Sequence, residues 1–341
     1  MKRLILLALS AALLLAGCVP APQKAQDKQY TATFLDLFNT VTTIVGRAES
    51  EEAFTLKAQA VHDALEEYHR LFDIYNDYEG VANLKSVNDN AGVAPVQVDE
   101  KIIRLIADAK AYCEMTGGRT NPAMGSVLVL WHEARNDSLN DPANAYLPDD
   151  DALRQAAQHV DLAGVVIDEA ASTVYIPDPG MRLDVGAVAK GWAVQRVCEQ
   201  SPEGLLISVG GNVCATGPKD AGGTPWVIGI QDPDSDEYLH TIYLSKGSVV
   251  TSGDYQRAYQ VGDKLYHHII DPDTLYPSEY WRSVTVVCPD SGLADALSTA
   301  LFVLPLDKGM QLAESCGIQA MWLDPDGSRH YTAGFDKMIR T

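Results

Sequence analysis

Residues 182–193 read RLDVGAVAKGWA, and this stretch predicts a strand ending at Asp184, a turn of small residues and a helix. The first turn of a helix offers free N–H groups and the positive end of the helix dipole, which suits a phosphate. Lys190 is expected there, although the residue order of a Walker A loop is absent. Two interpretations stay open: an anion site, or an aspartate that caps a helix packed on a sheet.

The sequence on both sides of this stretch predicts one α+β domain over residues 30–341, with a mixed, largely antiparallel sheet and packed helices. Apolar residues at helical spacing predict helices over 51–72, 100–116, 147–159, 186–199 and 292–302. Alternating apolar residues predict an opening strand or hairpin over 31–47 and strands over 164–167, 173–176, 205–209, 226–231, 239–250, 255–270, 283–288 and 319–323. Gly262 and Asp263 are expected to split the stretch 255–270 into a hairpin.

Composition excludes several functional classes. The 341 residues include 26 Lys+Arg against 46 Asp+Glu, a formal net charge of −20, so binding to nucleic acid is not expected. Hydrophobic residues make up 46% of the chain, which is typical of globular proteins and excludes disorder as the main state. After residue 20, no apolar run approaches the roughly 18 residues that a membrane span needs.

The amino terminus has the pattern of a bacterial lipoprotein signal. Lys2 and Arg3 precede a short apolar segment that ends LAGC, so residues 1–17 are predicted to be a signal peptide and Cys18 a lipidation site. Residues 18–29 then form a tether rich in Pro, Ala and Gln. The expected location is extracytoplasmic, on the periplasmic side, with a lipid anchor in the membrane. The alternative is an ordinary secretory signal that contains Cys18.

The five other cysteines show no Cys-x-x-Cys spacing, and their odd number argues against a complete disulfide framework. Most have apolar neighbours, so buried free thiols are expected. They are Cys113, Cys198, Cys214, Cys288 and Cys316.

Three further segments have residues suited to chemistry. The segment SVGGN (208–212) predicts a tight turn or a close backbone approach. In YHHIIDP (266–272) neighbouring histidines of a strand face opposite ways, so one of them is a candidate general base, and a packed histidine pair is the alternative. Asp295 and Thr299 share a helix face, where their oxygens suit Mg²⁺ better than zinc; a helix-start aspartate above a polar stripe is the alternative.

Taken together and in this order, these segments resemble the FAD:protein FMN transferase (ApbE) family of exported flavin-handling lipoproteins, from about Phe34 to Leu323. The most specific motifs are DVGAVAKGWA (184–193), SVGGN (208–212), TSGDYQRAY (251–259), YHHIIDP (266–272) and ADALSTALFVL (294–304). Further matches are FDIYNDYEGVANLKSVN (72–88) and TGGRTNPAMGSVLVLW (116–131).

The resemblance implies a Mg²⁺-dependent transferase that cleaves the pyrophosphate of FAD. It moves FMN through a phosphoester bond to a Ser or Thr hydroxyl of a partner, an exported or membrane redox flavoprotein, and releases AMP. It implies a metal site of the Asp295 carboxylate, the Thr299 hydroxyl and the Ala187 carbonyl, with His268 as the catalytic base. It also implies FAD contacts from Phe38, Tyr75, Arg119, Thr120, Asn121, Asp184, Lys190 and Ile269.

The chain departs from the family pattern at a few of these positions. Members often have Met-Gly-Thr where this chain has Phe38-Asn39-Thr40, and Asp where it has Asn121. Some have a further acidic residue at the position of Ser298, so water is expected to complete the metal shell here. A FAD diphosphatase, with water as the acceptor, and a non-catalytic FAD-binding lipoprotein stay open as alternatives.

Overall fold

The computed structural model describes residues 27–340 and is built on one sheet of eight strands. Every pair of neighbouring strands in this sheet is antiparallel. In spatial order the strands are β1 (Lys28–Leu37), β2 (Thr40–Ala48), β6 (Leu205–Val209), β7 (Asn212–Ala215), β10 (Gly247–Gly253), β13 (Ser283–Cys288), β14 (Gln319–Leu323) and β15 (Arg329–Tyr331). The predicted α+β class is confirmed.

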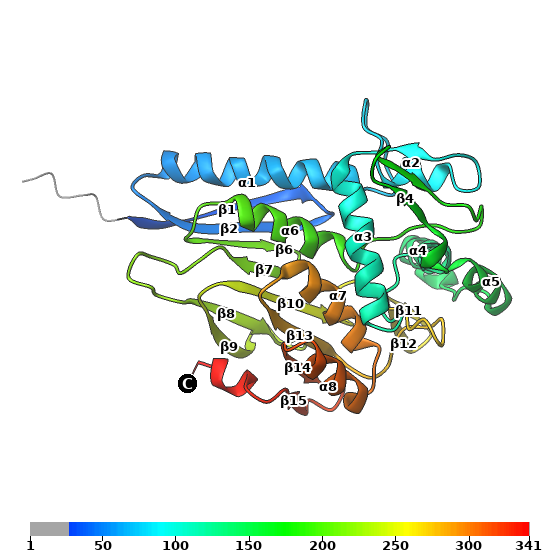
Figure 1. Ribbon diagram of the computed structural model, residues 1–341. Coiled ribbons are helices and arrows are strands. Elements are labelled where there is room, and N and C mark those ends of the chain that lie inside the picture. Colours follow the sequence, from blue (N-terminus) through cyan, green and yellow to red (C-terminus); the bar gives the residue numbers. More distant parts are fainter. Residues whose placement is uncertain (1–26, 341) are drawn as a thin grey trace, which may run out of the picture.

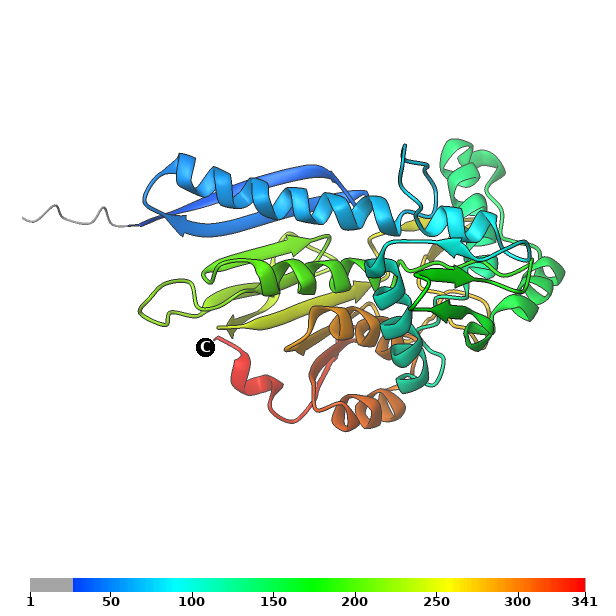
Figure 2. The same cartoon turned by 45° about the horizontal axis from the view of Figure 1, so that its top comes forward.

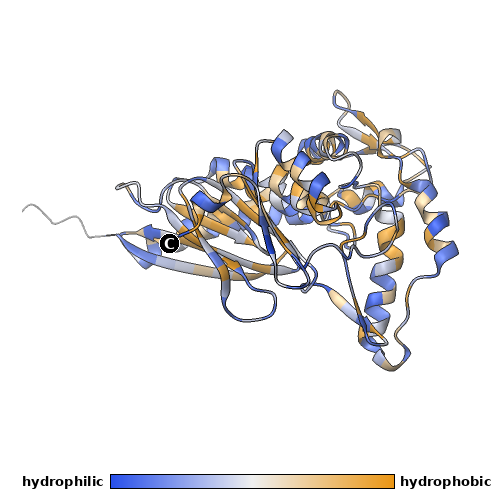
Figure 3. Cartoon of the chain, turned by 90° about the horizontal axis from the view of Figure 1, so that it is seen from below, coloured by the Kyte–Doolittle hydropathy of each residue, from blue (hydrophilic) through white to orange (hydrophobic). Residues whose placement is uncertain are grey.

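Helices cover one face of the sheet (Figures 1 and 2). They are α1 (Glu51–Phe72), α6 (Ala189–Gln200), α7 (Ser291–Phe302) and α8 (Leu306–Ser315). Alternate strand residues such as Ile207 and Val286 pack against these helices, because successive side chains of a strand point to opposite faces. The other face packs against the hairpin of β8 (Trp226–Gln231) and β9 (Tyr238–Leu244) and the short helix η4 (Phe335–Met338). In Figure 3 the hydrophobic residues are concentrated along the central strands.

Local sequence signals define where the main helices begin. At α1 the Ser50 side chain accepts a hydrogen bond from the Ala53 N–H, and Glu51 and Glu52 occupy the first turn. At α7 the Asp290 side chain accepts from the Leu293 N–H in the same way. In contrast, α6 begins without a side-chain cap, so Asp184 is not its N-cap residue.

The remaining elements lie mainly at the end of the sheet away from the start of β1 and from the C-terminus (Figures 1 and 2). The helices among them are α2 (Leu84–Asp89), α3 (Glu100–Met115), α4 (Gly125–Asn140) and α5 (Asp150–Ala156), with short turns η1 (Pro142–Asn144), η2 (Ala157–His159) and η3 (Leu162–Gly164). Two small sheets are formed by β3 (Val96–Gln97), β5 (Thr173–Tyr175) and β4 (Val166–Asp168), and by β11 (Ala258–Val261) and β12 (Lys264–His267).

Two predictions about strands were wrong. The single strand expected over 239–250 is two strands, because β9 pairs with β8 while β10 enters the main sheet beside β7. Gly247, with φ of 107°, starts the second of them. No regular strand ends at Asp184, since tertiary contacts hold this segment instead: the N–H of Leu183 donates to the Asn88 side chain at 2.7 Å.

Several elements were not predicted, namely α2, α4, α8, β7 and the short strands β3 and β15. The start of α4 reads GSVLVLW, a run of branched apolar residues that is typical of a strand, and tertiary packing makes it helical. Strand β1 begins at Lys28, so residues 28 and 29, which were assigned to the tether, belong to the sheet.

The predicted signal peptide and Cys18 lie outside the described residues. Within residues 27–340, no helix is both long and apolar enough to cross a membrane.

Candidate active site

One cavity of about 510 Å³ brings together residues that are far apart in the chain. This volume is within the usual range for a small-molecule or cofactor site. Its lining includes every predicted site residue that the structure describes: Phe38, Tyr75, Arg119, Thr120, Asn121, Asp184, Ala187, Lys190, His268, Ile269, Asp295 and Thr299. Their individual roles remain predictions.

A buried carboxylate lies at the contact between α6 and α7. The N–H of Gly191 donates to Oδ2 of Asp295 at 2.9 Å, and Asp295 is 4% exposed. A Cβ at Gly191 would lie 2.3 Å from the Ser291 carbonyl oxygen and 2.5 Å from Cβ of Asp295, so only glycine permits this close approach. The two helices therefore hold the carboxylate firmly against the cavity.

The turn before α6 presents a lysine to the same place. The Asp184 side chain accepts from the Gly186 N–H at 2.8 Å, and Nζ of Lys190 donates to the Gly186 carbonyl at 2.9 Å. Nζ of Lys190 also lies 3.7 Å from Oδ2 of Asp295. Asp184 thus shapes the turn, and Lys190 lies between this turn and the buried carboxylate.

Burial raises the pKa of Asp295, and Lys190 and the Gly191 N–H only partly offset this. The charged form of a carboxylate that is buried away from water in this way is stabilised by a cation beside it. Thr299 lies one turn further along α7, and Ala187 lies in the turn before α6. A carboxylate, a hydroxyl and a main-chain carbonyl are the oxygen ligands that Mg²⁺ prefers, so these residues fit the predicted metal.

The two neighbouring histidines have different environments. His267 uses both ring nitrogens within the protein, since Nε2 lies 2.7 Å from the Ser278 carbonyl oxygen and Nδ1 accepts from the Ile269 N–H at 3.2 Å. His268 lines the cavity, and its buried Nδ1 has no hydrogen-bond partner among residues 27–340. This leaves Nε2 as the ring nitrogen available to the cavity.

The pKa of His268 lies well below its usual range because the ring is buried, and Arg257, His267, Lys190 and Arg135 add positive charge nearby. His268 is therefore neutral at pH 7 and able to accept a proton. Arg257 and Arg135 border a small space beside it, and neither forms an ion pair within residues 27–340. Although the chain is acidic, this part of the cavity is cationic.

Aromatic residues lie at another part of the cavity. Phe38 and Asn39 form the turn between β1 and β2, each with φ of 52°, a conformation that asparagine tolerates better than most residues. Tyr75 is 57% exposed, and its hydroxyl lies 3.0 Å from Nδ1 of His132. Phe38 and Tyr75 thus offer two rings to a planar ligand.

The segment SVGGN was predicted to form a tight turn or a close backbone approach, and the structure shows both. Gly210 and Gly211 both have positive φ and form the turn between β6 and β7. A Cβ at Gly210 would lie 2.7 Å from the Thr40 hydroxyl, and Thr40 itself lines the cavity.

The segment 119–121 has most of its polar groups paired within the protein. Nη1 of Arg119 lies 2.5 Å from Oδ2 of Asp273, and the Thr120 hydroxyl donates to the Ala296 carbonyl at 2.6 Å. Nδ2 of Asn121 donates to the Val160 carbonyl at 2.9 Å. These bonds fix segment 119–121 as one wall of the cavity. They do not depend on a ligand.

Sequence reasoning did not select several other residues of the lining, among them His69, Asp73, His132, Asn212, Gln256 and Arg257. Asn212, Gln256 and Arg257 belong to motifs quoted above, so the signal for them was present. His69 and His132 lie on helices, and only the tertiary structure turns them towards the cavity.

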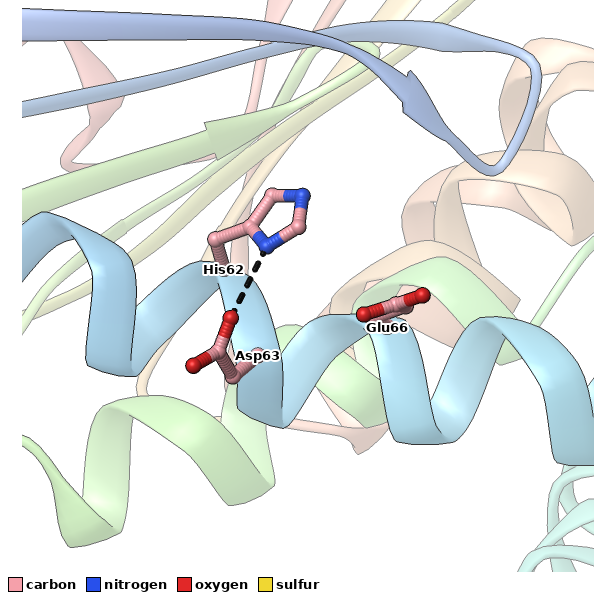
Figure 4. Close-up of side chains that lie close together, drawn as sticks. All are labelled: His62, Asp63 and Glu66. Carbon is pink, nitrogen blue, oxygen red and sulfur yellow. Dashed lines mark hydrogen bonds and ion pairs between the residues drawn. The ribbon is translucent and has the colours of Figure 1, made fainter.

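A second cluster of titratable groups lies outside the cavity lining, on α1 (Figure 4). Ligand atoms of His62, Asp63 and Glu66 lie within 4.8 Å of one another. However, Nδ1 of His62 lies 3.2 Å from Asp63 and Nε2 lies 3.0 Å from Asp36 on β1. Both ring nitrogens are already used, so we assign this cluster to the attachment of β1 to α1.

We predict that the pKa of His62 is higher than that of an ordinary histidine. Burial lowers the pKa, but the hydrogen bonds to Asp36 and Asp63 outweigh burial. Protonated His62 and its two aspartates therefore stabilise the fold fully at a pH below about 6.5, the pKa of a histidine in the unfolded chain. This stabilisation is lost as the pH rises through the higher pKa of His62 in the folded protein. An NMR titration of His62 should show the raised pKa, and Asp36→Asn should lower it. The His62→Gln variant should lose on the order of 1 kcal/mol at pH 6, and equal losses at pH 6 and pH 9 would contradict the ion pair.

The family model for the ApbE family matches residues 38–322. An FAD:protein FMN transferase from Treponema pallidum is 34% identical over 311 residues, which cover 83% of each chain. Another from Klebsiella pneumoniae is 32% identical, covering 70% of this chain and 76% of the relative.

Solved structures agree with these matches. The ApbE protein from Thermotoga maritima superposes with a TM-score of 0.81 at 30% identity, covering 92% of this chain and all of that one. A flavin transferase ApbE from Vibrio cholerae has the same fold, with a TM-score of 0.74 at 22% identity, over 92% of this chain and all of that one. The antiparallel sheet, its single helical layer and the cavity beside α6 and α7 therefore place the protein in the flavin-transferase class. The chain belongs to the ApbE family.

Proposed function

We propose that this protein is a Mg²⁺-dependent FAD:protein FMN transferase. It cleaves the pyrophosphate of FAD, attaches FMN through a phosphoester bond to a Ser or Thr hydroxyl of a partner flavoprotein, and releases AMP. The similarity to curated FAD:protein FMN transferases supports the reaction class. The metal and the phosphoester bond are inferred from the resemblance to the family together with the cavity residues, and the cellular setting is inferred from the amino-terminal sequence.

One observation carries the proposal: the neutral His268 and the Asp295–Lys190 pair line the same cavity. A base for a hydroxyl and cationic groups for a pyrophosphate are the two elements that this reaction needs. A protein that only stored FAD would need neither a buried carboxylate nor a neutral histidine in its cavity.

The proposed reaction forms one bond to phosphorus, breaks another and transfers one proton. The acceptor hydroxyl oxygen attacks the phosphorus of the FMN half, and its proton passes to Nε2 of His268. The bond from this phosphorus to the bridging oxygen breaks, and AMP leaves with that oxygen. Lys190 and Arg257 supply positive charge to the phosphates, which an otherwise acidic chain would repel. Phe38 and Tyr75 offer faces for the flavin ring.

The fit of Asp295, Thr299 and the Ala187 carbonyl to Mg²⁺ supports these three as its ligands. When bound, the ion would neutralise negative charge that develops on the pyrophosphate oxygens. The position of Lys190 beside Asp295 is consistent with a shared task, in which both offset the charge of an anionic substrate.

We further infer that Cys18 carries a lipid anchor and that the enzyme works on the periplasmic side of a bacterial membrane. β1 runs from Lys28 to Leu37, directly before the cavity residue Phe38. Ten strand residues span roughly 33 Å. The cavity therefore lies well away from the point where the tether enters the domain, which suits an exported or membrane-bound redox flavoprotein as the acceptor.

The first experiment incubates the full-length chain with FAD and Mg²⁺, with and without the exported domain of a membrane redox flavoprotein. Denaturing gels report covalent flavin fluorescence, and chromatography reports AMP. We expect a fluorescent acceptor band that EDTA abolishes. AMP and free FMN without a labelled band would instead indicate the diphosphatase, in which water replaces the hydroxyl. Recovery of intact FAD in every sample would indicate a flavin-binding lipoprotein and would contradict the proposal.

A further inference from the structure

One tyrosine of the cavity lining is held firmly at its backbone but is exposed at its side chain. Tyr75 follows the end of α1, in a loop where the Asp73 side chain accepts from the N–H of Tyr75 at 2.6 Å and from the N–H of Asn76 at 3.1 Å. These bonds fix the backbone at this point. Tyr75 is 57% exposed, so packing against the protein restrains its ring only in part.

A histidine on a different element holds the far end of this ring. His132 lies on α4, 57 residues further along the chain, and its Nδ1 lies 3.0 Å from the hydroxyl oxygen of Tyr75. The centroids of the two rings are 6.2 Å apart, and the angle between the ring planes is 50°. Both residues line the cavity, so this hydrogen bond joins two parts of its wall that come from different elements.

The helix that carries His132 is itself anchored in the protein. The preceding residue, Trp131, is 3% exposed, and its Nε1 donates to the Leu275 carbonyl at 3.0 Å. Trp131 also belongs to a buried hydrophobic cluster together with Tyr259. His132 therefore lies on a rigid support, and it can set the position of the more exposed Tyr75.

The protonation states of the two side chains give this hydrogen bond one direction. The usual pKa of a tyrosine is about 10, so the hydroxyl of Tyr75 keeps its proton at pH 7. Burial lowers the pKa of His132. Asp184 opposes this effect, whereas the positive charges of Arg135 and Arg257 add to it. The ring of His132 is therefore neutral at pH 7, and its Nδ1 accepts the hydrogen bond that the Tyr75 hydroxyl donates.

We propose that His132 is a positioning residue that holds the ring of Tyr75 in the orientation in which it packs against a planar ring of FAD. This inference rests on the proposed function, because it takes FAD as the ligand. A side chain that becomes ordered only when a ligand binds costs part of the binding free energy, and a side chain that is already held avoids this cost. His132 acts through Tyr75, so its loss should weaken FAD binding and leave the turnover of bound FAD nearly unchanged.

A double-mutant cycle on the full-length chain tests the proposal. Flavin fluorescence titration with Mg²⁺ present gives the Kd for FAD, and chromatography of AMP gives kcat. We expect Tyr75→Phe and His132→Leu each to raise the Kd about 3- to 10-fold, the range that corresponds to one hydrogen bond, and to change kcat by less than about two-fold. The variant with both substitutions should bind FAD as well as either single variant, because each substitution removes the same bond.

Two further variants make the test specific. His132→Asn keeps an acceptor oxygen close to the position of Nδ1 and should restore most of the affinity for FAD. His240→Leu removes a bond of the same kind, between Nε2 of His240 on β9 and the hydroxyl of Tyr331 on β15 at 2.7 Å, and these strands contribute no residue to the cavity lining of the described chain. This variant should keep the wild-type Kd.

Additive increases of the Kd in the double variant, or a wild-type Kd for a folded His132→Leu variant, would overturn the positioning role. Failure of the proposed function gives a different result. A wild-type chain that binds FAD and releases no AMP would contradict the transferase proposal, while the cycle in Kd would still test His132. A wild-type chain that releases AMP but shows an additive cycle would contradict the role of His132 alone.

Discussion

Asp295→Asn is expected to reduce Mg²⁺-dependent AMP release from FAD about a thousand-fold, because a metal ion contributes several kcal/mol to charge stabilisation. Asparagine keeps the size of the side chain and an oxygen that can accept from the Gly191 N–H, so the contact between α6 and α7 should persist. The initial rate of AMP release, measured against Mg²⁺ concentration, gives the result. Asp295→Ala should abolish turnover while leaving the fold intact.

The control removes one negative charge from a neighbouring helix outside the cavity. Glu314 on α8 is exposed, and Glu314→Gln should keep the wild-type rate and the wild-type Mg²⁺ dependence. Circular dichroism and Tm distinguish loss of the metal site from loss of the fold. Full activity of a folded Asp295→Asn or Asp295→Ala variant would remove the metal assignment.

His268→Ala is expected to slow FMN transfer by about 10²- to 10⁴-fold while changing the Kd for FAD only a few-fold. The reason is that, in the proposed reaction, the ring accepts the proton of the acceptor hydroxyl, a step that FAD binding does not require. Single-turnover transfer to the acceptor measures the first quantity, and flavin fluorescence titration measures the second. Equal losses in both would make His268 a binding residue.

The pH dependence of transfer is a further readout of the same residue. Since the pKa of His268 is depressed, the base stays deprotonated as pH falls through 6.5, and the rate should decline only below that range. His267→Gln is the matched control. Because His267 bonds to Ser278 and to the Ile269 N–H, this variant should lower the Tm and leave the acidic limb of the rate profile in place.

The cavity shows how a fold can make an acidic chain receptive to an anionic dinucleotide. Lys190, Arg119 and Arg257 line it, together with a buried carboxylate suited to a divalent cation. Asp73 and Asp184 also line the cavity, but most of the 46 acidic residues of the chain lie outside it. Local arrangement, rather than net charge, therefore governs what this site can bind.

The sequence by itself determined those features that depend on neighbouring residues. The spacing of apolar residues in 51–72 defined α1, and alternation in 205–209 defined β6, because each pattern expresses the period of one element. Asp295 and Thr299 could be placed on one face because four residues make about one turn of helix. The motifs from DVGAVAKGWA to ADALSTALFVL, taken in order, identified the family.

Only the tertiary structure decided how these pieces meet. GSVLVLW reads as a strand but folds as α4, and the single strand predicted over 239–250 is divided between two sheets, because packing outweighs local preference. Gly191 reads as an ordinary glycine, yet it permits the contact that holds Asp295. Such features arise from contacts between distant segments, and no local pattern records which atoms will lie against which.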